Sequence, residues 1–323
     1  MTSGAPCACT RTDAAVTPSI TLLGPQRRPT LDRVLSSLGV EGPVAVVNAG
    51  WQEREADDAE ILALAGGQAV NLRLFARWMT VLQADPEYAE AEREHRLVLD
   101  EMQQLYLIRL EHALQAVSAV ASRTDGHAHT QAMALDDALA ALRFLDATHL
   151  ARVGELQEAF YGTWRPEERG TIAGHREEVR ALLSAAECLV VAGGHVGDLL
   201  RVLHLFHLSP HLPPRVVAWS AGAMALTPRV VLFHDRAAQG ASLTEVFDVG
   251  IGVVPGLVLL PHARRRLRTD DHLRMSILAR RFAPASCLVL DDGVRVDPGP
   301  DGALPPDARV IDTDGRIAEG RAA

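Results

Sequence analysis

Hydrophobic and polar residues follow a β-α-β pattern at the start of the chain. The stretch SITLLG, residues 19–24, is typical of a short strand, and the uninterrupted apolar run in GPVAVVNAGW, residues 42–51, is typical of a strand buried on both faces. Between them, TLDRVLSSLG places Thr30 as a helix N-cap and Gly39 as a stop signal around one amphipathic helix. This opening favours a parallel sheet.

The alternation stops at residue 72, and strand signals are almost absent up to about residue 183. A long helical pattern opens at Asp85-Pro86, with proline at the first helical position. Apolar residues then recur every three to four positions, as on one face of a helix; they are Leu97, Met102, Leu105, Ile108, Leu110 and Leu114. A β-α-β crossover does not need so long a helical segment, so residues 72–183 are predicted to be an inserted all-helical subdomain.

Strand and helix signals alternate again after residue 183. The run CLVVAGG, residues 188–194, is followed by the helical pattern HVGDLLRVLHLF and then by the strand-like RVVAWSAG, residues 215–222. Five further strand-like runs follow, two before and three after a helical pattern over residues 263–282. We therefore predict an α/β fold with a doubly wound, mostly parallel sheet and an antiparallel C-terminal edge. Its core would be residues 18–71 and 184–323, and residues 1–17 would be a disordered tail.

Composition and charge narrow the class of protein. The 323 residues are 48% hydrophobic and 23% charged, with 41 acidic against 32 basic side chains and a formal net charge of −9. These values fit a soluble globular protein and disfavour a nucleic-acid partner. The N-terminus lacks an apolar core of signal-peptide length, and no apolar run approaches the ~18 residues of a membrane span. We expect a cytoplasmic protein without a membrane partner.

The four cysteines do not form the pattern of a disulfide framework. Cys7 and Cys9 lie in the predicted tail, while Cys188 and Cys287 begin strand-like runs. A reducing compartment fits this distribution. Cys7 and Cys9 lack a matching second pair of ligands, so we expect no metal site there. The serine chemistry considered next needs no metal and no organic cofactor.

Ser220 stands where a buried strand is predicted to turn into a helix. Val216 to Trp219 before it are apolar and β-prone, and Ala221 to Leu226 after it are small and helix-compatible. This is the arrangement of a nucleophile elbow, in which the serine side chain projects from the carboxyl edge of the sheet. A tight turn that merely needs a small residue would show the same local pattern. Whether Ser220 is a nucleophile therefore depends on whether catalytic partners lie near it.

An activated serine needs a base, a group that orients the base, and N–H donors for the oxyanion. The best-placed base is His262, at the end of the predicted strand GLVLLPH; His195 and His234 also follow predicted strands. Asp235, fifteen residues beyond Ser220, could orient His262. All of these lie where carboxyl ends of strands bring ligands together.

The amide groups of Gly194 and Ala221 are the natural oxyanion donors, because glycine lets the backbone come close to a ligand. Glu245 and Asp248 are reserve candidates for the acid.

Four ordered stretches, VVAGGHVGDLL, VVAWSAGAMAL, VVLFHD and GIGVVPGLVLLPHARRRLR, resemble the serine peptidase family that contains dipeptidase E and cyanophycinase. The fold of that family resembles class I glutamine amidotransferases. The resemblance implies Ser220 as nucleophile, His262 as base and Asp235 as the acid of the dipeptidase branch, with Gly193 and Gly194 contributing to the oxyanion hole. It covers residues 188 to about 295 well and the N-terminal β-α-β loosely, and it does not cover the helical insertion.

Two positions depart from the family's pattern. His195 stands where the family usually has asparagine after the double glycine, which bears on substrate orientation, and Ala218 replaces the first glycine of the elbow. The arginine-rich stretch after His262 has two interpretations. It is either a solvated basic face paired with acidic residues such as Asp270 and Asp271, or it supplies Arg264 or Arg266 to neutralise a substrate carboxylate.

The sequence thus predicts a serine hydrolase that cleaves a peptide or amide bond in a small, acidic or isoaspartyl-like peptide; the substrate class follows from the resemblance alone. A catalytically inactive scaffold that binds partners through its helical insertion is the alternative. An α/β-hydrolase esterase fits less well, since its acid usually follows the serine by a longer interval than Asp235 does. The leucine-rich faces of the insertion require a packing partner, which makes a homodimer one expectation.

Overall fold

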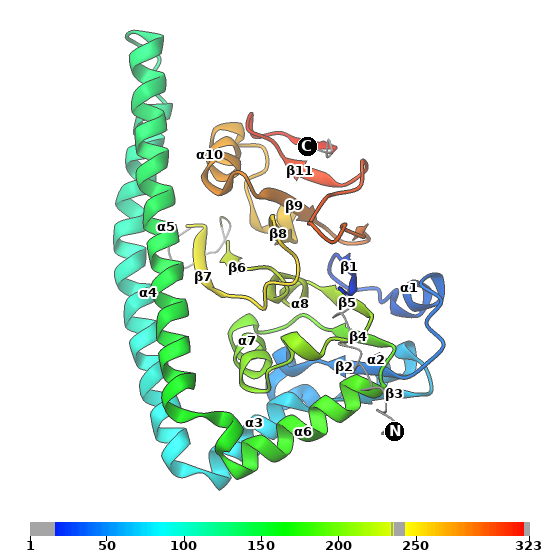
Figure 1. Ribbon diagram of the computed structural model, residues 1–323. Coiled ribbons are helices and arrows are strands. Elements are labelled where there is room, and N and C mark those ends of the chain that lie inside the picture. The colour runs from blue at the N-terminus through cyan, green and yellow to red at the C-terminus, as the bar shows by residue number, and fades with distance from the viewer. Residues whose placement is uncertain (1–16, 234, 236–242, 320–323) are drawn as a thin grey trace, which may run out of the picture.

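The computed structural model describes residues 17–233, 235 and 243–319, and its central element is a six-stranded, mostly parallel sheet (Figure 1). In sheet order the strands are β10 (Arg295–Val296), β1 (Ser19–Leu23), β5 (Arg215–Trp219), β4 (Cys188–Val191), β2 (Val44–Val47) and β3 (Ala69–Asn71). All pairs are parallel except β10 with β1. The expected α/β class with a parallel-rich sheet is confirmed.

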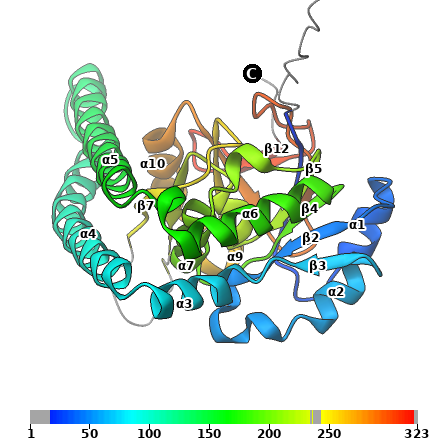
Figure 2. The same ribbon diagram turned by 60° about the horizontal axis from the view of Figure 1, so that its bottom comes forward.

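Alternate residues of the central strands point to two separate apolar layers, as expected for a sheet covered on both faces. In β2, Val44 and Val46 pack with the apolar residues of α1 (Leu31–Ser37) and α2 (Ala59–Ala65), whereas Ala45 and Val47 pack on the other face. That second layer receives α6 (Gly170–Ala185) and α7 (Val196–Leu205), as Figure 2 shows. The sheet is therefore the middle of three layers.

The later strands do not extend this sheet, contrary to the single sheet expected from the sequence. They form a four-stranded sheet of β12 (Ile317–Glu319), β11 (Arg309–Ile311), β9 (Ser286–Leu290) and β8 (Leu257–Pro261), and a pair of β6 (Arg229–Leu232) with β7 (Glu245–Val249). The reason lies at the edge of the central sheet, where β10 pairs antiparallel with β1 and occupies the position that a further parallel strand would need.

The helical segment contains a long hairpin of α4 (Pro86–Ala121) and α5 (Ala128–Trp164) that projects past the sheets (Figure 1). As predicted, α4 begins at Pro86, and the Asp85 carboxylate accepts a hydrogen bond from Tyr88 N at 3.1 Å. Arg169 binds the same carboxylate through Nε at 2.5 Å and Nη2 at 2.7 Å, which closes the base of the hairpin. The flanking helices α3 (Leu74–Ala84) and α6 pack against each other, and α3 also packs on α7 of the core. The part of the chain that projects is thus the α4–α5 hairpin alone, which is shorter than the predicted insertion of residues 72–183.

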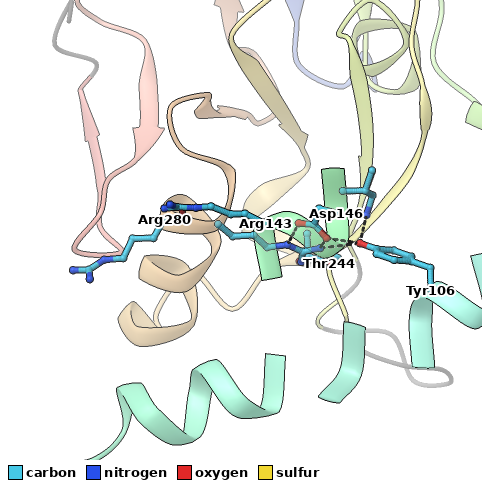
Figure 3. Close-up of polar contacts among 7 residues, drawn as sticks. Tyr106, Arg143, Asp146, Thr244 and Arg280 are labelled. Carbon is cyan, nitrogen blue, oxygen red and sulfur yellow. Dashed lines mark hydrogen bonds and ion pairs between the residues drawn. The ribbon is translucent and has the colours of Figure 1, made fainter. Parts of the chain in front are cut away.

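A buried polar network attaches the hairpin to α10 (His272–Phe282) and β7 (Figure 3). Arg281 of α10 donates to both oxygens of Asp146 of α5, at 2.6 and 2.7 Å, and to the carbonyl of Thr244 at 2.6 Å. Tyr106 of α4 donates to Asp146 at 2.8 Å and accepts from Val246 N at 3.2 Å. Arg281 is only 3% exposed, so its charge is not solvated by water. Its hydrogen bonds to Asp146 and Thr244 take the place of that solvation.

The helix expected over residues 263–282 is in fact two helices, α9 (Ala263–Arg266) and α10. The break follows from Asp271, whose carboxylate accepts from Arg274 N at 3.0 Å and so starts a new helix at His272. No helix in the described part of the chain is long and apolar enough to cross a membrane.

Candidate functional site

Ser220 occupies a backbone conformation that non-glycine residues rarely adopt. Its φ is 51° and its ψ is −123°, between the end of β5 and α8 (Ala221–Ala225). A residue held in this region costs on the order of 1–3 kcal/mol and persists only when its surroundings enforce it. A serine in a sharp strand-to-helix turn of this kind is the local geometry of a nucleophile elbow.

Glycines on both sides of the elbow make this turn possible. A Cβ at Gly193 would lie 2.7 Å from Ser220 Cβ, and a Cβ at Gly222 would lie 2.3 Å from the carbonyl oxygen of Val191. The loop after β4 therefore lies directly against the serine. This is the juxtaposition that the two glycine-containing motifs predicted.

The backbone after β4 leaves amide donors near Ser220. Gly194 has a φ of 139°, and its position is set by Gly50, whose carbonyl accepts from His195 N at 2.7 Å. Among the described residues, the N–H groups of Gly194 and Ala221 have no hydrogen-bond acceptor. Neither group has a competing acceptor there, and the oxyanion role expected for them from the sequence stays a prediction.

His262 follows β8 with a left-handed backbone, at φ 58° and ψ 31°. Because β8 pairs parallel with β9, Pro261 is opposite Leu290, and His262 lies beside the residues that follow β9. His262 Nδ1 is 4.0 Å from Oδ1 of Asp292. Burial lowers the pKa of His262 from its usual value, and so does the charge of Arg266, while Asp292 acts in the opposite direction. His262 is therefore a mostly neutral imidazole at neutral pH, as a general base must be.

No hydrogen bond joins Ser220 to His262 in the described part of the chain. Such contacts in free enzymes are often long and tighten only when substrate binds. The contact between Ser220 and His262 that catalysis requires therefore stays a prediction.

Asp235 does not contact His262, which corrects its expected role as the orienting acid. Its buried carboxylate accepts from Arg274 Nη2 at 2.6 Å and Nε at 2.9 Å, and from Arg268 N at 3.2 Å. Asp235 thus holds the segment between α9 and α10. The spacing from Ser220 suggested that Asp235 lies near the serine, but it could not show that Arg274 binds the Asp235 carboxylate. His234 lies outside the described residues.

The reserve acids Glu245 and Asp248 face the hairpin. Glu245 accepts from Gln103 Nε2 at 2.8 Å, and Asp248 accepts from Gln157 Nε2 at 2.7 Å. Burial raises the pKa of both carboxyls. Among the described residues, the carboxylate within 4.0 Å of a His262 ring nitrogen is that of Asp292.

Asp292 is not among the acids that the sequence predicted for the site. The signal was present, since Asp291 and Asp292 directly follow the predicted strand SCLVL and the carboxyl ends of parallel strands share an edge. The sequence did not show that β8 pairs with β9, because this pairing joins segments that are far apart in the chain.

His195 is the N-cap of α7, and its side chain belongs to a polar chain at the start of that helix. Its Nδ1 lies 2.9 Å from Asp198 Oδ2, and the same carboxylate accepts from Gln52 Nε2 at 2.6 Å. The imidazole is 58% exposed and lies next to Gly197. It is therefore placed to contact a ligand that reaches the loop after β4.

Two of the arginines after His262 are paired with the aspartates that follow β9. Arg264 Nε lies 3.4 Å from Asp291, and Arg265 Nη2 lies 3.3 Å from Asp292. Arg266 is half-buried and makes no ion pair with any described residue, and its charge reaches His262. Of the two arginines proposed for a substrate carboxylate, Arg266 is the one without an ion pair to the described part of the chain.

Metal-ligating side chains do not cluster: within residues 17–233, 235 and 243–319, no group of three or more His, Cys, Asp or Glu could hold an ion. Cys188 and Cys287 are buried free thiols, and burial raises the pKa of each to about 12. Cys7 and Cys9 lie outside the described residues.

No protein-family model and no curated protein sequence matches the chain. Among solved structures it is similar to a "Crystal structure of a peptidase from an acI-B1 Actinobacterium", with a TM-score of 0.46 and 13% sequence identity over 95% of this chain and 96% of that one. A likeness of this degree shows neither the family nor the activity of this chain.

Proposed function

We propose that the protein is a serine hydrolase that cleaves a peptide or amide bond, similar to dipeptidase E and cyanophycinase and with their glutamine amidotransferase-like arrangement. The observation that carries the proposal is the backbone of Ser220, which is strained at φ 51° and packed against Gly193. Strain of this kind at a half-buried serine has a cost in stability, and strained residues of this kind cluster at active sites.

The proposed reaction is acyl transfer through Ser220. Its Oγ attacks the carbonyl carbon and its proton passes to His262, while the carbonyl oxygen becomes an anion held by the amides of Gly194 and Ala221. The intermediate collapses, the C–N bond breaks, and the leaving amine takes the proton from His262. Water, deprotonated by the same imidazole, then hydrolyses the acyl-enzyme. Asp292 is the group that orients His262 in this proposal.

The substrate is proposed to be a small acidic or isoaspartyl-like peptide. This follows from the family resemblance and from Arg266, whose charge acts on His262 and whose guanidinium has no ion pair with a described residue, so that it suits a carboxylate. No metal or organic cofactor enters the proposed chemistry.

Hydrolysis of aspartyl dipeptides by purified protein tests the proposal. Ser220→Ala should abolish turnover, and Asp292→Asn should lower kcat at least tenfold, since it removes the acid nearest His262. Asp291→Asn is the matched control, because Asp291 pairs with Arg264 rather than with His262; it should retain most of the activity. Equal activity of wild type and Ser220→Ala would reject the proposal.

An inactive scaffold is the second candidate, and two observations favour it. Ser220 and His262 are not hydrogen-bonded, and the hairpin exposes large apolar side chains such as Leu105, Ile108 and Phe144, which are 54%, 58% and 74% exposed. If self-association through the hairpin is the function, light scattering should show a dimer that Phe144→Glu or Ile108→Glu dissociates. A monomeric protein that turns over peptide would exclude this candidate.

A further inference from the structure

A cavity of about 310 Å³ lies between the hairpin and the core, next to the loop that carries His195. Its walls come from α4, α5, α7 and β7, so it exists only because the hairpin is attached where it is. One side is apolar, with Phe160, Tyr161 and Phe247 among its residues. The volume is that of a site for a small ligand or one end of a peptide.

Arg96 of α4 lines this cavity, and its charge acts on Glu92 by lowering the pKa of that carboxyl. Its Nε is shielded from solvent without a hydrogen-bond acceptor, and its guanidinium makes no hydrogen bond or ion pair with any described residue. A buried polar group without a partner has a cost, and a charged donor most of all. The usual explanation of such a group is a ligand or water that satisfies it.

The other cations that line the cavity are already compensated. Arg93 pairs with Glu90 at 2.5 Å, and Arg201 lies 3.2 Å from Glu92 while also binding Asp198. Burial lowers the pKa of His95, which therefore adds little positive charge near neutral pH.

The buried carboxylates of the cavity are also occupied. Glu92 accepts from Trp78 Nε1 at 2.9 Å, and Asp248 accepts from Gln157. Among the described residues that line the cavity, Arg96 and Asp100 are the charged ones without a hydrogen bond or ion pair; Asp100 is exposed, whereas the Nε of Arg96 is shielded from solvent.

The cavity is within reach of Ser220. Gly197 lines the cavity and is four residues beyond Gly193, which lies against the serine. Four residues span at most about 14 Å, so a peptide of about four residues could extend from the elbow into the cavity.

We propose that this cavity binds the C-terminal residue of the peptide substrate, with its apolar wall against the side chain and Arg96 paired with the terminal carboxylate. An arginine fork matches a carboxylate in a bidentate manner, and an aromatic wall suits an apolar last residue. This inference rests on the proposed hydrolase function, and it assigns part of the specificity to the hairpin rather than to the core.

Binding can be measured without catalysis on the full-length Ser220→Ala protein. The probes are the tetrapeptide Asp-Ala-Ala-Phe and its C-terminal amide, compared by isothermal titration calorimetry. The free acid should bind roughly 10- to 100-fold more tightly than the amide. Adding Arg96→Gln should remove that difference, and Arg96→Lys should keep part of it.

Arg109→Gln is the matched control, because Arg109 is an exposed arginine on the same helix and does not line the cavity. It should change the affinity by less than about twofold. Thermal unfolding of each variant without ligand identifies a change caused by misfolding.

Equal binding of acid and amide, or equal losses in Arg96→Gln and Arg109→Gln, would overturn the proposal. Inorganic phosphate is the third probe; if it binds through Arg96 while the tetrapeptide acid does not, the cavity takes a free anion and the proposal is also wrong. The tetrapeptide acid could bind through Arg96 although the wild-type protein does not hydrolyse peptides. That result would reject the hydrolase function and retain the cavity as a peptide-binding site.

Discussion

The elbow at Ser220 and the hairpin of α4 and α5 are positioned by different means. The elbow is fixed by backbone, since Gly193 and Gly222 let two strand ends approach within distances that a Cβ would not allow. The hairpin is fixed by side chains, above all by the buried pair of Arg281 with Asp146.

This difference has consequences for function. A site set by backbone contacts is rigid but tolerates no added atoms, whereas a site set by a charged pair depends on both partners being present. If the substrate spans both regions, catalysis depends on the first and specificity on the second.

The largest expected effect comes from breaking the charged pair. Asp146→Ala leaves Arg281 buried without its carboxylate and should lower the free energy of unfolding by about 3–5 kcal/mol. Urea unfolding of the purified variants measures this. The double variant Asp146→Leu with Arg281→Met should recover much of the loss. A loss below about 1 kcal/mol in Asp146→Ala would mean that the pair does not hold the hairpin.

Adding one methyl group at the elbow should have the next largest effect. The Cβ of Gly222→Ala would overlap the carbonyl oxygens of Val191 and Ala192, at 2.3 and 2.7 Å, and should cost about 1–3 kcal/mol. Gly174→Ala on α6 is the control, since no atom lies within 4 Å of the added Cβ. It should stabilise the protein by about 0.5–1 kcal/mol. Similar changes in both variants would contradict the account of the elbow.

The strain at Ser220 predicts a smaller effect. Ser220→Gly relieves the unfavourable φ of 51°, whereas Ser220→Ala keeps it, so the glycine variant should be the more stable of the two by about 1 kcal/mol. Differential scanning calorimetry of the two variants makes the comparison. If the alanine variant is equally stable, the conformation is not strained.

The pH dependence tests the neighbours of His262. A general base must be neutral, so the rate at which a fluorophosphonate probe modifies Ser220 should rise with pH through the pKa of His262, which burial and the charge of Arg266 hold below its usual value. Arg266→Gln removes a positive charge, raises that pKa and should move the rise to higher pH. Asp292→Asn should move it to lower pH. A profile that neither variant changes would mean that His262 is not the base.

Local features of the fold could be predicted from the sequence. The start of α4 at Asp85-Pro86 and the strand-turn-helix around Ser220 depend on capping, proline and glycine chemistry within a few residues. Strand existence was likewise predictable from apolar runs. Strand pairing was not, because the closure of the central sheet by β10 joins residues far apart in the sequence.

The same limit explains the errors at the site. Asp235 was chosen by its spacing, but the arginine that binds it, Arg274, lies 39 residues away. Asp292 approaches His262 only because β9 pairs with β8. The attachment of Arg281 to Asp146 spans 135 residues, and the Arg96 cavity depends on it. Such contacts are set by tertiary packing rather than by local pattern.

The central claim is that Ser220 is an activated nucleophile. Treating the wild-type protein with a fluorophosphonate probe and mapping the adduct by mass spectrometry tests it most directly, with Ser220→Ala and His262→Ala alongside. The account predicts a single adduct on Ser220 that is absent in Ser220→Ala and forms at least tenfold more slowly in His262→Ala. No adduct on the folded wild type, or equal labelling of wild type and His262→Ala, would contradict it.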